Sequence, residues 1–203
     1  RGSHDPVGTS GGEKSYGPGS AMVHMDSVFA PWRIDWVERD DRNEDVEGCI
    51  FCAIPERETD RDDRVVARND LAYVILNNYP YNPGHVMIIP NRHTGAFQDL
   101  DEETLLAHDR LLQRTIVALE NSLEPDGINT GCNLGRSAAG GSVGDHLHTH
   151  VVPRWTGDTN FMPVIAETNV IVEALEDTYE RLHDAYADLD GATVRGDDCA
   201  VEF

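Results

Sequence analysis

The sequence predicts an α+β domain, in which a mostly antiparallel β-sheet carries one main helix and a second helix near the C-terminus. Two observations predict this fold class. Apolar runs of strand length occur in two pairs, and a long segment with helical periodicity separates the pairs. The connection within each pair is short and rich in turn residues, which favours antiparallel neighbours.

The first predicted strand pair spans residues 71–89. Residues 71–76 form a continuous apolar run of strand length. Residues 77–84 contain Pro80, Pro83 and Gly84, which are typical of a turn. A second apolar run occupies residues 85–89, and Pro90 predicts its end.

The main helix is predicted over residues 101–123. Asp101 can cap the first turn, and two glutamates follow it where the helix dipole favours negative charge. Pro125 lies just beyond the predicted end. The apolar side chains fall on one stripe of the helix, at Leu105, Leu112, Ile116, Leu119 and Leu123.

The second predicted strand pair consists of residues 128–134 and 146–153, joined by a glycine-rich turn at 135–144. An amphipathic helix is predicted at 168–186. We expect residues 25–190 to form a single domain and residues 191–203 to form an acidic tail outside it.

The first 24 residues have the composition of an expression-tag remnant. They are rich in Gly and Ser, lack apolar periodicity and begin Arg1-Gly2-Ser3-His4. We expect this segment to be disordered and the natural protein to begin near Met25.

The charge balance is strongly acidic, with a net charge of −21. Lys14 is the sole lysine, so the expected natural protein balances its carboxylates with arginine alone. Such a surface stays soluble when salt screens its self-repulsion, which predicts a halophilic source; an ordinary acidic cytosolic protein is the alternative. The sequence lacks a basic stripe for nucleic acid and an apolar run near the ~20 residues of a membrane span, so neither partner is expected.

The four cysteines are Cys49, Cys52, Cys132 and Cys199. Two of them form a Cys-x-x-Cys motif, and the others stand at unrelated spacing. This is not the pattern of a disulfide framework, so we expect a cytoplasmic location.

Three alternating histidines carry the strongest chemical signal: His146, His148 and His150. On a strand they would project from one face, with the outer two about 13 Å apart. Three ligands for one tetrahedral metal are awkward to supply from one straight strand. The row therefore favours one reacting histidine with neighbours that orient it.

The loop that precedes the histidines is rich in glycine from Gly135 to Gly144. Backbone N–H groups in such a loop can approach an anion closely, and Ser142 adds a hydroxyl donor. Next to the histidines, this loop is interpreted as a phosphate cradle.

The Cys49-x-x-Cys52 motif is compatible with a zinc half-site, a redox pair or two buried thiols. Without a second motif of this kind, the remaining zinc ligands would be histidines, and the candidates are His85, His93 and His146. His108 and His183 fall in predicted helices and are expected to lie on the surface.

Together these features resemble the histidine-triad (HIT) superfamily over nearly all of residues 49–155. The matching parts occur in order: the cysteine motif, Asn-Pro-Gly-His ending at His85 with Pro-x-x-His ending at His93, the loop from Asn133 to Ser142, and the triad. Residues 77–85, 140–146, 154–155 and 160–161 are also similar to the branch that contains diadenosine tetraphosphate phosphorylases.

The resemblance implies roles for individual residues. His148 would be the nucleophile that forms a nucleotidyl-histidine intermediate, His150 would hold its tautomer and contact phosphate, and His85 would line the same site. The implied nucleotide and phosphate contacts are Asn77 for the ribose, with Asn133, Gly141 and Ser142. Arg154 is a further candidate, because its charge could offset charge developing on the phosphate oxygens.

Zinc-bearing members of the superfamily imply a ligand set of Cys49, Cys52, His93 and His146. With four protein ligands such a zinc is structural, because no position stays open for a substrate. Members of the superfamily commonly form dimers, so the resemblance also implies a homodimer.

One departure from the family pattern is Val143 after Gly140-Gly141-Ser142, where hydrolytic branches typically carry a Gly-Gln-Ser/Thr run. This departure points away from a simple phosphoramidate hydrolase. The triad and the Gly-Gly-Ser loop motivate the main hypothesis, a phosphorylase that cleaves dinucleoside polyphosphates with phosphate as acceptor. The alternatives are a HIT hydrolase of dinucleoside polyphosphates or phosphoramidates, a hydrolase with zinc at the reaction centre, and a nucleotide-binding regulatory module.

Overall fold

The computed structural model describes residues 48–57, 59–134, 145–158 and 173–203. The predicted tag, the glycine-rich turn with Gly141 and Ser142, and the first part of the last predicted helix lie outside the described residues.

The centre of the fold is a six-stranded sheet in the order β4-β5-β3-β2-β1-β6. Neighbouring strands are antiparallel, except that β6 runs parallel to β1. The strands are β1 (Val65–Arg68), β2 (Ala72–Leu76), β3 (Val86–Pro90), β4 (Gly127–Cys132), β5 (Thr149–Arg154) and β6 (Val201–Glu202).

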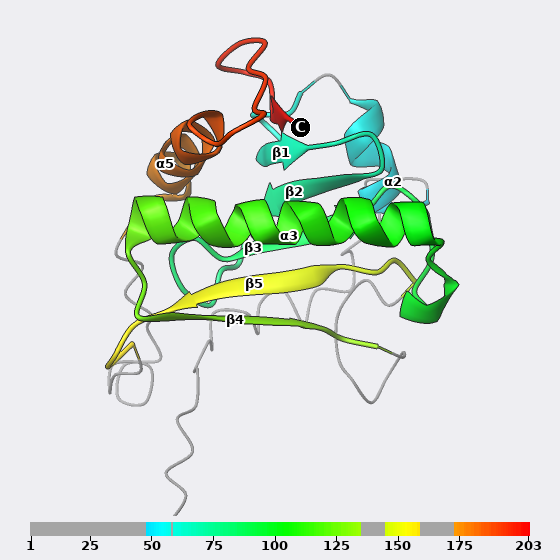
Figure 1. The fold of residues 1–203 in the computed structure, drawn as a ribbon, viewed down its shortest axis with the longest axis horizontal. Helices are drawn as coiled ribbons and strands as arrows, with labels where there is room; N and C mark the ends of the chain where they lie inside the picture. The colour runs from blue at the N-terminus through cyan, green and yellow to red at the C-terminus, as the bar shows by residue number, and fades with distance from the viewer. Residues whose placement is uncertain (1–47, 58, 135–144, 159–172) are drawn as a thin grey trace, which may run out of the picture.

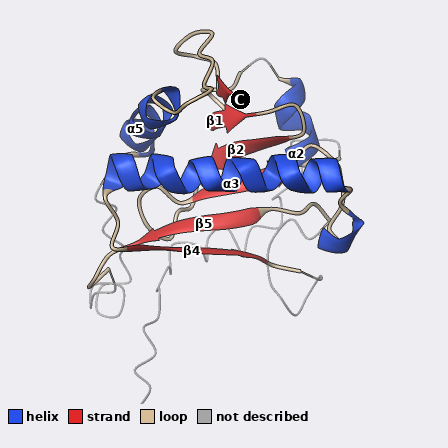
Figure 2. Cartoon of the chain, in the orientation of Figure 1, coloured by secondary structure: helices blue, strands red, loops and turns tan. Residues whose placement is uncertain are grey.

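The long helix α3 (Glu102–Leu123) lies across one face of this sheet (Figure 1). The second long helix, α5 (Leu175–Ala187), contacts both α3 and β1. Figure 2 shows α2 (Ile50–Ala53) at the other end of β1 from α5. Two short 3₁₀ turns, η2 (Ile54–Glu56) and η3 (Phe97–Asp99), complete the described elements. The predicted α+β class with its two helices is confirmed.

The two faces of the sheet carry different parts of the core. Side chains alternate along each strand, so Val86 and Ile88 face α3, whereas Ile89 packs with Phe51 on the opposite face. On β5, Val151 belongs to the α3 side of the core. The residues of alternate parity on these strands, including the candidate catalytic histidines, therefore project from the face that α3 does not cover.

Helix α3 begins where the sequence predicts. The side chain of Asp101 accepts a hydrogen bond of 2.8 Å from the backbone N–H of Thr104, which satisfies one of the orphan donors of the first turn. The helix ends at Leu123, and the next residue, Glu124, has a left-handed φ of 47°. The predicted cap and the predicted end of this helix are confirmed.

Gly84 occupies the turn between β2 and β3 with a φ of +76°. A Cβ at this position would overlap Leu123 Cδ1 and would lie 3.2 Å from Leu119 Cδ2 and from Pro153 Cγ. Glycine is therefore needed both for the backbone conformation and for the close approach of the turn to the end of α3.

The structure differs from the sequence predictions in three elements. Strand β1 was not predicted. Strand β5 starts at Thr149, so His146 precedes the strand instead of opening it. The C-terminal residues, expected to form a tail outside the domain, include β6, and Val201 is fully buried beside β1.

The expected surface positions of His108 and His183 are wrong. Their exposed fractions are 2% and 7%. A hydrogen bond offsets the cost of burying each ring. His108 Nε2 lies 2.8 Å from Thr149 Oγ1, and His183 Nε2 donates to the backbone carbonyl of Cys199 at 3.0 Å.

No helix among the described residues combines the length and the apolar character needed to cross a membrane.

Candidate active site and metal site

Two cysteines and two histidines converge near the start of α2. Cys49 Sγ lies 3.2 Å from His146 Nδ1, and Cys52 Sγ lies 3.2 Å from His93 Nδ1 and 3.5 Å from His146 Nδ1. All four ligand atoms lie within 4.8 Å of one another. Ligand atoms around a tetrahedral zinc with bonds of about 2.0–2.3 Å are about 3.3–3.8 Å apart, so this cluster fits zinc.

The ring of His146 is oriented for this cluster by a second contact. Its Nε2–H donates to the backbone carbonyl of Pro90 at 2.8 Å, which leaves the lone pair on Nδ1, the nitrogen that faces the thiols. Burial lowers the pKa of His146, which favours the neutral imidazole that metals bind.

The Cys52 thiol is partly buried beside Cys49. Burial, together with the hydrogen bond to the Cys49 thiol, raises its pKa to about 11. The convergence of His93 and His146 on the two thiols favours the zinc half-site over the redox pair.

His148 stands next to this cluster, with its tautomer fixed by the backbone. Its Nδ1–H donates to the carbonyl oxygen of His146 at 2.9 Å. The lone pair is therefore on Nε2, the atom that would attack phosphorus. His146 thus contributes its side chain to the cysteine cluster and its carbonyl to the orientation of His148.

His85 and His150 form a directed pair. His85 Nδ1 accepts the backbone N–H of Tyr81 at 3.1 Å, so its proton is on Nε2. That Nε2 donates to His150 Nδ1 at 2.9 Å, which places the proton of His150 on its own Nε2. The neutral His150 ring consequently presents an N–H donor, and its centroid lies 5.1 Å from that of His148.

Two aromatic rings support these histidines, and neither was predicted as part of the site. Phe51 contacts both His146 and His148, with centroid distances of 5.6 Å and 5.4 Å. Tyr81 stacks on His85 at 4.9 Å with an interplanar angle of 12°. The sequence signal for Phe51 was its position between the two cysteines, and that for Tyr81 was its position in the Pro-rich turn.

Asn77 is buried at the end of β2, beside His85. Its Oδ1 accepts the backbone N–H of Tyr79 at 2.8 Å, while its Nδ2 lies 3.6 Å from Met87 Sδ. The carbonyl end of the amide is thereby held in the turn, and the amide nitrogen lies 3.5 Å from His85 Nε2.

Among the contacts of the described residues, neither Asn133 nor Arg154 is bonded to the histidines. Asn133 is exposed just beyond β4. The Arg154 guanidinium forms a two-pronged ion pair with Asp158, at 2.5 Å and 3.0 Å, and also donates to Asn129 at 2.8 Å. A phosphate contact by either residue stays a prediction.

The triad histidines do not share one metal within the described part of the chain. His146 belongs to the cysteine cluster, whereas His148 and His150 take their hydrogen bonds from the backbone and from His85. This division disfavours the hypothesis of a hydrolase with zinc at the reaction centre.

Comparisons with known proteins identify the family of similar chains. Residues 58–157 match the family described as "HIT domain". The chain is 39% identical over 168 residues to "AP-4-A phosphorylase" of Mycobacterium tuberculosis, an alignment that covers 80% of this chain and 85% of the relative.

Two solved structures are similar as well. A zinc-bound histidine triad family protein from Mycobacterium smegmatis is 31% identical with a TM-score of 0.57, covering 70% of this chain and 96% of that one. A hypothetical histidine triad nucleotide-binding protein from Sulfolobus tokodaii is 30% identical with a TM-score of 0.53, covering 68% and 89%.

Proposed function

The chain belongs to the HIT family, and from this premise we propose that it cleaves dinucleoside polyphosphates through a nucleotidyl-histidine intermediate, with phosphate as the acceptor. The observation that carries the proposal is the tautomer of His148, whose Nδ1–H is held by the His146 carbonyl. The identity to a relative named AP-4-A phosphorylase supports diadenosine tetraphosphate as the substrate to test first.

In the first step, the lone pair of His148 Nε2 attacks the α-phosphorus of the substrate. A P–N bond forms, the bridging P–O bond breaks, and ATP leaves when the substrate is diadenosine tetraphosphate. The N–H of His150 would donate to a phosphate oxygen as negative charge builds there, and the neutral His85 maintains that orientation.

In the second step, an oxygen of inorganic phosphate attacks the same phosphorus. The P–O bond forms as the P–N bond breaks, which releases ADP and restores His148 as a neutral base. Two displacements at one phosphorus replace one difficult direct transfer. We further propose that Asn77 binds the ribose and that Asn133, Arg154 and the loop residues Gly141 and Ser142 contact the phosphates.

The residues proposed to hold zinc are Cys49, Cys52, His93 and His146. Their donor set and separations support a closed four-ligand site. Zinc there would cross-link the start of α2, the segment after β3 and the segment before β5. The homodimer, the halophilic source and the cytoplasmic location stay predictions from the sequence.

The test is to incubate the chain with diadenosine tetraphosphate in high salt, with and without phosphate, and to identify the products. ADP plus ATP that appear only with phosphate support the phosphorylase. AMP plus ATP irrespective of phosphate would instead make the enzyme a hydrolase that uses His148 and water. Binding of nucleotide without any turnover would favour the regulatory module.

The same assay with His148→Ala tests the nucleophile. We expect turnover to fall by about 10³-fold or more, because no other described group offers a nucleophilic lone pair at that place. A His148→Ala protein with full turnover contradicts the mechanism. The metal content of this variant should be unchanged, because His148 is not one of the proposed ligands.

A further inference from the structure

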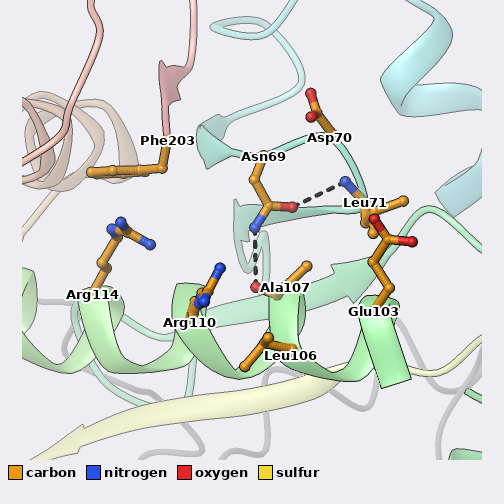
Figure 3. Close-up of a pocket in the computed structure, with 9 residues that line it drawn as sticks. All are labelled: Asn69, Asp70, Leu71, Glu103, Leu106, Ala107, Arg110, Arg114 and Phe203. Carbon is orange, nitrogen blue, oxygen red and sulfur yellow. Dashed lines mark hydrogen bonds between the residues drawn. The ribbon is translucent and has the colours of Figure 1, made fainter. Parts of the chain in front are cut away.

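A hollow of about 380 Å³ lies between α3 and the turn that joins β1 to β2, with Phe203 at one end. Figure 3 shows Arg110 and Arg114 rising into it from α3, and Asn69 facing them from the turn. Because α3 covers the sheet face opposite the catalytic histidines, this hollow is separate from the candidate active site.

Arg110 and Arg114 have no acidic residue three or four positions away on their own helix, although Asp109 is next to Arg110 in sequence and Glu103 lies two turns before it. They stand four residues apart, so their side chains share one face of α3 and repel each other. The positions three and four residues away from either one hold Leu106, Ala107, Leu111, Gln113, Val117 and Ala118. In a chain with 37 acidic residues against 16 basic ones, a partner at these positions is conspicuously absent.

Tertiary partners do not compensate for this. Within the described residues, neither Arg110 nor Arg114 forms an ion pair, and Arg64 bonds the side chain of Asn78. The remaining described arginines each contact a carboxylate: Arg57, Arg61, Arg68, Arg92, Arg154, Arg181 and Arg195. The two arginines in the hollow are thus exceptional in a chain where acceptors are plentiful.

The walls of the hollow are fixed. The Asn69 side chain donates to the carbonyl of Ala107 at 3.0 Å and accepts the N–H groups of Leu71 and Ala72 at 3.0 Å and 2.9 Å. This ties the turn to α3. At the other end the Arg114 guanidinium lies over the Phe203 ring, 4.3 Å from its centroid, which restricts its orientation.

We propose that this hollow binds a small organic molecule with a single phosphate group, which bridges Arg110 and Arg114. Paired planar guanidiniums match the oxygens of a phosphate, and a bound dianion would remove their mutual repulsion. The hollow has the size of a small-ligand site, and Leu71 and Leu106 provide apolar contact.

The acidic side chains of the hollow define the rest of the ligand. Glu103 lies away from the two arginines in Figure 3, and Asp70 borders the same side. Carboxylates accept hydrogen bonds from sugar hydroxyls and repel a second phosphate. This selects a sugar phosphate or a nucleoside monophosphate over a polyphosphate.

The test is a titration of the ¹⁵N-labelled full chain with AMP, ribose 5-phosphate and inorganic phosphate, followed by NMR. The reporters are the Nε–H groups of Arg110 and Arg114 and the backbone amides of Leu71 and Ala107. We expect saturable shifts with AMP or ribose 5-phosphate, at least about tenfold tighter than with inorganic phosphate. AMP would also enter the proposed active site, so the shifts are assigned to the hollow by their loss in the arginine variant below, and this assignment does not depend on turnover.

The Arg110→Gln/Arg114→Gln variant should lose these amide shifts, while turnover of diadenosine tetraphosphate stays unchanged. Arg57→Gln/Arg195→Gln removes the same charge from two exposed, ion-paired arginines and should retain the shifts. The proposal is overturned if none of the probes gives a saturable shift, or if the shifts persist in the first variant. Inorganic phosphate binding as tightly as AMP would also overturn it, because the organic part would then contribute nothing.

Discussion

At the scale of single residues, the buried His108 links the exposed Asp109 to the buried Thr149 on β5. Its Nδ1–H donates to Asp109 at 2.9 Å, so its Nε2 accepts the hydroxyl of Thr149 at 2.8 Å. Thr149 lies between His148 and His150 in sequence but points to the opposite face, where Cys132 Sγ is 3.0 Å away. These contacts connect α3, β5 and β4 through polar groups that are all paired.

We predict that His108→Leu lowers the free energy of unfolding by about 1–3 kcal/mol, because it leaves the Thr149 hydroxyl buried without its acceptor. The measurement is urea denaturation. Thr149→Val in the same background should recover part of the loss, since both polar partners are then replaced by apolar groups. If the double variant is as unstable as the sum of the single ones, the two residues do not interact as described.

The convergence of Cys49, Cys52, His93 and His146 was predicted from the sequence through its resemblance to a family, whereas the role of His148 as nucleophile stays a proposal. The burial of His108 and His183 could not be predicted from the sequence. Each has polar neighbours in its own helix, and the partners that bury them, Thr149 and the Cys199 carbonyl, lie 41 and 16 residues away. Helical periodicity cannot reveal a partner of that kind.

At the scale of elements, the turn between β2 and β3 is positioned by contact with the end of α3. This turn carries Tyr81, whose N–H orients His85, and Gly84, where an added Cβ would meet Leu119 and Leu123. The same turn therefore packs against α3 and orients His85, so a change in its packing should also change the orientation of that histidine.

Gly84→Ala should destabilise the protein by about 2–4 kcal/mol. The reason is the sum of about 1 kcal/mol for a positive φ and about 1–3 kcal/mol for overpacking against α3. Gly157→Ala is the matched control, because its φ is +82° but nothing lies within 4 Å of the added methyl. Equal losses in thermal denaturation of the two variants would refute the overpacking argument.

The segment after β5 is held by Asp158. Hydrogen bonds from Arg154, then from Asn82 and the backbone of Trp155, lower the pKa of this carboxyl below its ordinary 3.8. A lowered folded-state pKa stabilises the fold fully above the unfolded value, and this stability disappears as the pH falls through the folded value.

The stability difference between the wild type and Asp158→Asn should therefore be constant above about pH 5 and shrink below about pH 4. Urea denaturation at a series of pH values measures it. The pKa of the exposed Asp126 is also lowered, by the N–H of Thr156. The stability difference between the wild type and Asp126→Asn should therefore depend on pH in the same direction. A difference that grows toward low pH would contradict the assignment.

The strands and helices with long apolar patterns were predictable, whereas the short ones were not. β2, β3, α3 and β4 differ from the predictions by a few residues at their ends. β1 and β6 are short, and β6 carries one fully buried residue, Val201. Such strands are set by the neighbours that they pair with, which local periodicity does not encode.

At the scale of the whole molecule, the cysteine cluster joins three segments that are far apart in sequence. Cys49 is separated from His146 by 97 residues and Cys52 from His93 by 41. Metal binding to the folded chain alone would therefore stabilise the entire domain.

Removal of metal with a chelator should lower stability by at least about 2 kcal/mol, which is roughly 4–8 °C in Tm for a chain of this size. Cys49→Ser should reproduce the shift and abolish any further effect of the chelator. Cys199→Ser is the control, because this cysteine is outside the cluster. Identical melting of the treated and untreated wild type, with one zinc confirmed before treatment, would exclude a structural role.

The double use of His146 also restricts how this protein can diverge. A substitution at 146 removes the imidazole but leaves the backbone carbonyl that aligns His148, and the N–H of Leu147 still donates to Thr94 at 2.6 Å. A related protein could thus lose the metal and still orient His148, provided that the backbone hydrogen bond between Leu147 and Thr94 is kept. Descendants without the cysteines should consequently vary at 146 more freely than at 147, where the Leu147 side chain is buried.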